Sequence, residues 1–237
     1  MTCPQAIARD DRRGCEIHAI VNINNDYNFF KIKIETKEDK MGRFEAIELP
    51  YKKLKGISHE QIAEHFEVLY KGYVSKVNAI RNKAEDGFEA LPNATYDYFR
   101  ELKLEESFAL NGVKLHEIYF LGLGGDGAVP DEMRKILAKN FGSFENWQER
   151  FYGLGMASRG WAVLYYDFDE KRLYNGLGDW HSHGGVWNAK PILALDVYEH
   201  AYFIDFGTKR KNYIDAWFDN LNWQYILEEL KNIKKCP

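Results

Sequence analysis

The sequence predicts an α+β fold, in which a helical half precedes a half that contains a small antiparallel sheet. Apolar residues recur at helical spacing between residues 58 and 120, and after that stretch apolar and aromatic runs typical of strands begin at Trp161. The tryptophans divide the chain in the same way, because all six lie at or after Trp147. We therefore predict three parts: an amino-terminal extension at 1–48, a helical hairpin domain at 49–128 and an α+β domain at 129–237.

A β-hairpin is predicted within the extension. Apolar residues alternate from Ile17 to Ile23 and again from Phe30 to Ile34. The turn-prone Asn24-Asn25-Asp26 separates the two runs, and this pattern is typical of a hairpin. Three roles are open for the extension: a hairpin packed on the domain, an element that docks a partner, and a segment that becomes ordered only on association.

Two long helices are predicted for the helical half. Ser58 can cap a helix, and apolar residues follow it every three or four positions as far as Ile80. The second helical stretch runs from Thr95 to Phe120, with charged residues near its start and His116 in its apolar, aromatic end. We interpret the two helices as a helical hairpin.

The segment from Gly122 to Gly127 has the form G-x-G-x-x-G. A dinucleotide-binding loop needs a strand before these glycines and a helix directly after them. Here a helix precedes them, and Pro130 marks a later helix start. We interpret the segment as a flexible hinge between the two halves.

The α+β half should alternate helices and strands. Gly142 and Ser143 separate its first two helices as terminator and cap, and Asp169-Glu170 turns the first strand into the second. The predicted elements are helices at 131–140 and 143–157, strands at 161–168, 172–177 and 191–195, and helices at 211–220 and 222–235.

Composition excludes several classes of protein. The chain has 36 acidic and 32 basic side chains, a net charge of −4, and no dense Lys/Arg stripe, so we expect no nucleic-acid partner. No apolar run approaches the roughly 18 residues of a membrane span, and we expect no membrane segment. The odd number of cysteines, Cys3, Cys15 and Cys236, cannot close into a disulfide framework, which favours a cytoplasmic location.

Histidines carry the candidate chemistry. All three cysteines are terminal and no Gly-x-Ser-x-Gly elbow occurs, so a Cys or Ser nucleophile is not expected. Asp196 and His200, four apart directly after a predicted strand, can converge on one metal ion, and mixed N/O ligation suits iron, manganese or zinc. The alternative is that Asp196 caps the following turn and His200 is merely hydrogen-bonded.

Further histidines lie elsewhere along the chain. His65 and His116 can be satisfied core residues, or they can join Asp196 and His200 in a three-histidine, one-carboxylate set suited to iron or manganese. Asp179, His181 and His183 form a second candidate cluster, but the glycines after it indicate a mobile loop and disfavour a local zinc site. His18 and His59 have no obvious partner.

At this point the sequence resembles the iron/manganese superoxide dismutases. The run Asp196-Val-Tyr-Glu-His-Ala-Tyr202 resembles the D-x-W-E-H-A-Y signature of that family, with Tyr198 in the Trp position. The resemblance covers about Leu49 to Leu230 and leaves the extension unexplained. Other family-like landmarks occur in the right order: Leu49-Pro50-Tyr51, His65 with Tyr73, His116 with its aromatic followers, Arg159-Gly-Trp161-Ala, Lys209-Arg210 with Tyr213, and Asn222-Trp223.

The resemblance implies an enzyme that converts superoxide into dioxygen and hydrogen peroxide with one iron or manganese per chain. Tyr73 would be the gateway residue that orders water for proton delivery, and Trp161 would wall the substrate pocket. Attraction of the small anionic substrate would come from local positive charge, because the whole chain is weakly acidic. The implied metal ligands are His65, His116, Asp196 and His200, with a solvent molecule as the fifth.

Outside the ligands, the sequence departs from the family pattern. Many members place a Gln against the metal-bound solvent, and one of its two positions corresponds to Gly112, which cannot serve. His181 resembles the subgroup that uses a His instead, and that subgroup favours iron. His183 is the less favoured alternative for this contact.

A second departure concerns the subunit interface. The resemblance places Leu69 and Phe203 where the family has a His and a Tyr that bond across the interface, so both polar partners are replaced together. Glu199 remains, and in the family this residue reaches a ligand His of the other subunit. A homodimer, or a tetramer built from it, is therefore implied.

Two other readings compete with the enzyme. One is a non-catalytic paralogue kept for its structure, although such proteins tend to lose ligands and all four are present here. The other is a mononuclear iron oxygenase, which would need the ligand face that the third His occupies. In the favoured reading an aromatic shell surrounds the metal, with these residues nearest: Tyr73, Tyr119, Phe120, Trp161 and Tyr198.

Overall fold

The computed structural model describes residues 43–86, 92–95 and 97–235. Phe44 begins the compact unit that contains every helix and strand described below. The β-hairpin predicted between Ile17 and Ile34 lies outside the described residues. The domain boundaries at 48/49 and 128/129 therefore stay predictions.

The first long helix forms as predicted, but with a wide turn inside it. Helix α1 (His59–Ala63), the π-helix η1 (Glu64–Tyr70) and helix α2 (Lys71–Asp86) follow one another without a break. The Ser58 side chain accepts the Gln61 N–H at 3.0 Å, which confirms the cap. Isolated π turns are often found at functional sites, and this one contains His65 and ends three residues before Tyr73.

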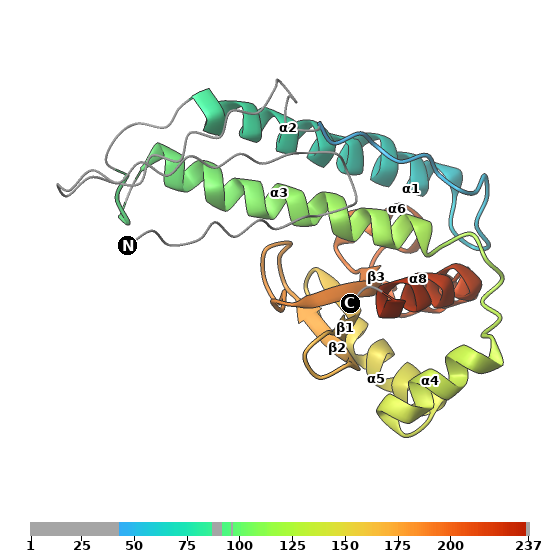
Figure 1. The fold of residues 1–237 in the computed structure, drawn as a ribbon. Coiled ribbons are helices and arrows are strands. Elements are labelled where there is room, and N and C mark those ends of the chain that lie inside the picture. Colours follow the sequence, from blue (N-terminus) through green and yellow to red (C-terminus); the bar gives the residue numbers. More distant parts are fainter. Residues whose placement is uncertain (1–42, 87–91, 96, 236–237) are drawn as a thin grey trace, which may run out of the picture. The chain divides into compact units, whose positions relative to one another are not determined.

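Helix α3 (Tyr98–Leu121) lies antiparallel beside α2, and the two form a helical hairpin (Figure 1). The Asp97 side chain accepts the Arg100 N–H at 3.0 Å and caps α3, so the helix begins three residues later than predicted. Arg81 Nε of α2 donates to Glu106 Oε1 of α3 at 2.9 Å, which adds a partly buried ion pair to the apolar contact.

The predicted three-stranded antiparallel sheet is present. Strands β1 (Trp161–Asp167), β2 (Arg172–Gly178) and β3 (Ala189–Asp196) have the order β2-β1-β3. Strand β3 starts two residues earlier than predicted and runs one residue further. The register pairs Trp161 with Asp196, so the start of β1 lies beside the end of β3.

Of the remaining helices, α4, α5 and α8 contact the sheet, and α3 packs on β3 (Figure 1). Ser143 caps α5 by accepting the Asn146 N–H at 2.9 Å, as predicted. Two short helices between β3 and α7 had no counterpart in the sequence prediction. Within the described residues, no helix combines the length and apolarity that a membrane crossing needs. The helices are α4 (Asp131–Phe141), α5 (Phe144–Ala157), η2 (Glu199–Ala201), α6 (Phe203–Phe206), α7 (Arg210–Asp219) and α8 (Trp223–Lys235).

The glycine-rich segment connects α3 to α4, but it is held in place rather than free. Gly125 N–H donates to Asn220 O at 3.0 Å, and Asn222 N–H donates to Gly122 O at 2.8 Å. A Cβ at Gly125 would lie 2.3 Å from Leu221 O, so only glycine allows this close approach. The prediction of a flexible hinge was therefore wrong, because backbone hydrogen bonds hold this connection against the turn between α7 and α8.

Candidate metal centre

Four side chains from different elements converge at the junction of the helical hairpin and the sheet. His65 comes from η1, His116 from α3, Asp196 from the end of β3 and His200 from η2. One nitrogen or oxygen atom of each lies within 4.8 Å of those of the other three. We refer to these four residues as the metal cluster, and they are the same four that the resemblance implied as ligands.

The cluster is centred on one carboxylate oxygen. His65 Nε2 and His200 Nε2 each lie 3.1 Å from Asp196 Oδ2, and His116 Nε2 lies 3.5 Å from the same atom. His65, His116 and Asp196 are fully buried, whereas the His200 side chain is 26% exposed. Three imidazole nitrogens therefore face a single oxygen inside the protein.

Local backbone chemistry explains how Asp196 presents that oxygen. Its other oxygen, Oδ1, accepts the Tyr198 N–H at 2.9 Å and caps the turn after β3. Its backbone carbonyl accepts the Tyr213 hydroxyl at 2.7 Å. Asp196 thus caps the turn with one oxygen, as one of the two interpretations of the sequence expected, while its other oxygen faces the histidines.

His116 is oriented from the opposite side. Its Nδ1–H donates to the Gly112 carbonyl at 2.6 Å, one helical turn earlier, which leaves Nε2 as the lone-pair atom that faces the cluster. Within the described residues, His116 Nε2 is a buried atom with no hydrogen-bond partner. Such orphaned buried groups are rare and costly, and a metal ion bound there would satisfy this one.

Burial and charge set the protonation states of the cluster. Burial, followed by the neighbouring His65, lowers the pKa of His116 to about 3, so its imidazole is neutral. Burial also lowers the pKa of His65. For His200, burial is outweighed by the charge and hydrogen bond of Asp196, and the pKa is raised. Asp196 therefore favours the protonated form of His200, and a bound cation would compete with that proton.

The Asp196 carboxyl remains ionised although it is completely buried. Burial by itself raises its pKa, but the charge and hydrogen bonds of His200 and His65 outweigh that effect and hold the pKa below its usual range. An ionised buried carboxylate needs a positive partner. The ring nitrogens and this carboxylate form a donor set of the kind that binds iron or manganese.

His181 lies beside the cluster, between Trp161 and Tyr73. Trp161 Nε1–H donates to His181 Nδ1 at 2.9 Å, and His181 Nε2 lies 2.9 Å from Tyr73 Oη. Because an indole nitrogen only donates, His181 Nδ1 must be the acceptor and Nε2 carries the hydrogen. Burial lowers the pKa of His181 to about 4, which keeps it neutral.

His183 points elsewhere. It is exposed, and its Nδ1 lies 3.5 Å from the Asp179 N–H as a local loop contact. By contrast, the His181 ring centroid lies 5.7 Å from that of His116, and His181 is only 4% exposed. Of the two candidates from the loop after β2, only His181 is placed next to the metal cluster.

Aromatic rings enclose the cluster as the sequence predicted. The rings of Tyr119 and Phe120 lie 5.0 Å from that of His65. The other three predicted members also lie in contact with cluster histidines: Trp161 at 5.1 Å and Tyr73 at 5.4 Å from His116, and Tyr198 at 5.2 Å from His200. These rings exclude water and strengthen electrostatic interactions at the centre.

Two residues that support the site were missed by the sequence analysis. Gln61 is fully buried, and its Nε2 donates to the His200 carbonyl at 2.6 Å. The Phe108 ring lies 4.6 Å from the His181 ring. Helical spacing carried a signal for both, because Gln61 precedes His65 by four positions and Phe108 precedes His116 by eight.

Gly112 shapes the same wall of the site. A Cβ at this position would lie 3.0 Å from two ring atoms of Tyr73. A side chain at position 112 would therefore require Tyr73 to shift by a few tenths of an ångström. Glycine itself has no side chain, so position 112 cannot supply the outer hydrogen-bonding residue in this chain.

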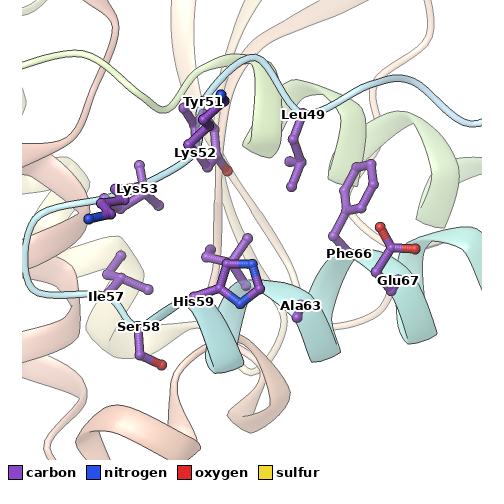
Figure 2. A pocket seen from close by; sticks show the side chains of 12 residues that line it. Leu49, Tyr51, Lys52, Lys53, Ile57, Ser58, His59, Ala63, Phe66 and Glu67 are labelled. Atoms are coloured by element: carbon purple, nitrogen blue, oxygen red, sulfur yellow. The ribbon is translucent and has the colours of Figure 1, made fainter.

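A separate pocket of about 660 Å³ lies between the segment at 49–58 and the start of the helical hairpin. Figure 2 shows the extended segment with Leu49, Tyr51 and Lys53 running alongside the helix that carries His59 and Glu67. Its lining includes none of the metal cluster residues. The pocket is therefore distinct from the candidate metal centre.

Known proteins match this chain over most of its length. Residues 129–229 match the family model described as iron/manganese superoxide dismutases, C-terminal domain. The superoxide dismutase (Fe) of Aquifex pyrophilus is 41% identical over 189 residues, which cover 77% of this chain and 88% of that protein. The superoxide dismutase (Fe) of Cupriavidus metallidurans is 38% identical over 73% of this chain and 87% of its own. The superoxide dismutase (Mn) of Haloarcula marismortui is 31% identical over 73% and 85%.

Proposed function

This chain belongs to the iron/manganese superoxide dismutase family, and from that premise we propose that its metal is held by the four residues of the metal cluster. The protein is a superoxide dismutase, which converts superoxide into dioxygen and hydrogen peroxide with iron or manganese as its cofactor. The observation that supports the assignment of the ligands is the convergence of three Nε2 atoms on Asp196 Oδ2.

The residues fit such an ion in number, charge and orientation. His116 Nε2 is an orphaned acceptor that faces the cluster, and Asp196 supplies the negative charge that a cation needs. When bound, the metal supplies the one-electron couple that takes an electron from one superoxide and gives it to a second. Neutral imidazoles and one carboxylate tolerate both oxidation states because none of them needs to change its own charge.

Proton delivery falls to Tyr73 and His181. Formation of hydrogen peroxide consumes two protons, and Tyr73 is the member of this pair that is partly exposed to solvent. Burial and the Asp196 charge raise the pKa of Tyr73, so the hydroxyl stays protonated. Because His181 Nε2–H donates to Tyr73 Oη, the Tyr73 hydrogen is free to point at water or substrate.

Trp161 is proposed to wall the substrate pocket. It is completely buried, and its indole ring stands edge-on to His116 at 5.1 Å between centroids. Its N–H is already committed to His181 and does not compete for the substrate. The ring therefore contributes shape and exclusion of water rather than a donor.

We favour iron over manganese as the resident metal. The relatives with 38–41% identity are named as iron enzymes, whereas the manganese enzymes are 30–32% identical. The position of His181 beside the cluster agrees with the iron-preferring subgroup that the sequence resembles. Manganese is the alternative outcome of the loading experiment below.

Metal removal and reloading test the proposed centre. We expect a chelator to abolish superoxide consumption, and we expect iron to restore it at one ion per chain. Anomalous scattering at the iron and manganese edges should then place that ion between His65, His116, Asp196 and His200. Consumption of superoxide by metal-free protein, or a bound ion elsewhere, would contradict the proposal.

We also propose that the chain forms a homodimer through the surface near His200. Glu199 is exposed there, and three apolar side chains on η1 and α6 are about half exposed: Val68 at 57%, Phe203 at 48% and Ile204 at 50%. Apolar surface of this kind marks interaction sites. Sedimentation should give about twice the 27.7 kDa chain mass, or four times if dimers pair, and Phe203→Glu should shift it towards the monomer. A wild-type mass of one chain would refute the dimer.

For the location we propose the cytoplasm, on the basis of three cysteines that cannot form a complete set of disulfides. Fractionation of the source cells is the direct measurement, and enzyme found in a secreted or periplasmic fraction would contradict it.

A further inference from the structure

Tyr198 is the residue at which this chain departs from the D-x-W-E-H-A-Y pattern, and it contacts two residues of the metal cluster. Its N–H donates to Asp196 Oδ1 at 2.9 Å. Its ring stacks on the His200 ring with centroids 5.2 Å apart and an interplanar angle of 16°. The backbone and ring of Tyr198 are therefore tied to two of the proposed ligands.

The other end of the Tyr198 side chain reaches a different segment. The hydroxyl donates to the Asp179 carbonyl at 3.1 Å, in the loop between β2 and β3. The Asp179 carboxylate accepts the Arg159 N–H at 3.1 Å. Asp179 is thus held from two sides, and it stands two residues before His181.

The loop between β2 and β3 depends on such an anchor. Residues 182–188 are all exposed, and Trp187 is 95% exposed, so apart from His181 and the hydrogen bonds of Asn188 at its far end the loop is held by little buried surface. At Gly184 the backbone turns back with a φ of +81°, and a Cβ there would lie 2.0 Å from Leu177 O. His181 is the loop side chain that enters the site, and its position depends on how the exposed loop is fastened.

Three segments pack closely at Gly160: the residue before β1, the loop after β2 and the segment after β3. A Cβ at Gly160 would lie 2.8 Å from Gly178 O and 2.9 Å from both Asp179 O and Tyr198 Cε2. The Tyr198 ring also lies 5.4 Å from the His181 ring. Gly160 before β1, Asp179 in the loop and Tyr198 after β3 are therefore in direct contact. The hydrogen bond from the Tyr198 hydroxyl to the Asp179 carbonyl joins the last two.

We propose that Tyr198 is a positioning residue, whose hydroxyl holds Asp179 and thereby fixes the His181 imidazole between Trp161 and Tyr73. The inference rests on the role of His181 in the proposed function. His181 has one hydrogen to donate, and its Nδ1 must accept from Trp161. Both contacts are lost together if the loop shifts, because hydrogen bonds weaken steeply with misalignment.

The test compares Tyr198→Phe with Tyr152→Phe in the metal-loaded enzyme. Both variants remove a tyrosine hydroxyl that donates to a backbone carbonyl, and Tyr152, whose partner is Lys211 O at 3.3 Å, lies on α5 outside the site. In Tyr198→Phe we expect kcat to fall about five- to tenfold, the scale of one lost hydrogen bond. Metal content and KM should stay unchanged, and Tyr152→Phe should behave as wild type.

Hydrogen–deuterium exchange gives a readout that does not depend on activity. The peptide that spans residues 177–185 should exchange faster in Tyr198→Phe and at the wild-type rate in Tyr152→Phe. Asp179→Ala removes the other anchor of the loop and should change exchange and kcat in the same direction. Asp179→Ala keeps the carbonyl that the Tyr198 hydroxyl contacts, so it tests only the Arg159 contact. If Tyr198→Phe does not fold, Tyr198→Trp, which places the residue of the family pattern at this position and also removes the hydroxyl, decides by the same two measurements.

The outcomes separate this inference from the proposed function. Unchanged loop exchange and unchanged kcat in Tyr198→Phe would overturn the positioning role. In that case a loss of activity in His181→Ala would still support the proposed function. Inactive metal-loaded wild-type enzyme would refute the function, and the loop exchange rates would still decide whether Tyr198 holds the loop.

Discussion

Replacement of Asp196 by alanine is expected to remove both the bound metal and the activity. Asp196 Oδ2 is the atom on which three imidazoles converge, and the residue is completely buried. Loss of a residue that merely supports a ligand costs about 10–100-fold in metal affinity, so loss of the carboxylate itself should lower activity more than about 100-fold. Elemental analysis and superoxide consumption on the same sample measure both effects.

Asp219→Ala is the matched control for this change. Asp219 is an exposed carboxylate on α7 that pairs with Lys55 at 2.9 Å, outside the metal cluster. This variant should retain its metal and its activity. The assignment of the ligands fails if Asp196→Ala, shown to be folded by circular dichroism, still binds one ion per chain and consumes superoxide at the wild-type rate.

Replacement of His181 by alanine is expected to separate metal binding from catalysis. His181 is not a member of the metal cluster, so the ion should stay bound. The change leaves Trp161 Nε1 and Tyr73 Oη without their partner, and the hydroxyl that we propose to deliver protons is no longer held. Activity should fall by about 10–100-fold, the range for general acid–base and outer-shell contributions.

Two further variants test whether the loss of activity is specific to the imidazole of His181. His183→Ala changes an exposed histidine of the same loop and should leave kcat within about twofold, as surface changes usually do. His181→Gln keeps one acceptor and adds a second N–H, so it should recover most of the activity. Full activity in His181→Ala, or a large loss in His183→Ala, would show that the proposed residue is the wrong one.

Local patterns predicted the regular elements of the described residues well. Apolar spacing identified the long helices, and the strand signals located β1, β2 and β3 to within two residues. Capping chemistry located the starts at Ser58 and Ser143. These features depend on neighbours in the chain, whose preferences are readable without the fold.

The irregular parts escaped that reasoning. The π turn at Glu64–Tyr70 and the short helices at Glu199–Ala201 and Phe203–Phe206 contain too few residues to show a period. The segment at 122–127 has the composition of a flexible hinge, yet it is clasped by backbone hydrogen bonds to residues 220–222. Its partners lie about a hundred positions further along, where no local signal links the two.

The sequence by itself determined the fold class, the family and a candidate ligand set, because periodicity and the run from Asp196 to Tyr202 are local properties of the chain. Tertiary structure alone decided that three histidines meet on one oxygen of Asp196, that His181 rather than His183 lies beside it, and that the Tyr198 hydroxyl contacts the loop at Asp179. The physical reason is that these contacts join segments distant in sequence, and only the packing of α3, η1 and the sheet sets which atoms come within a few ångströms of one another.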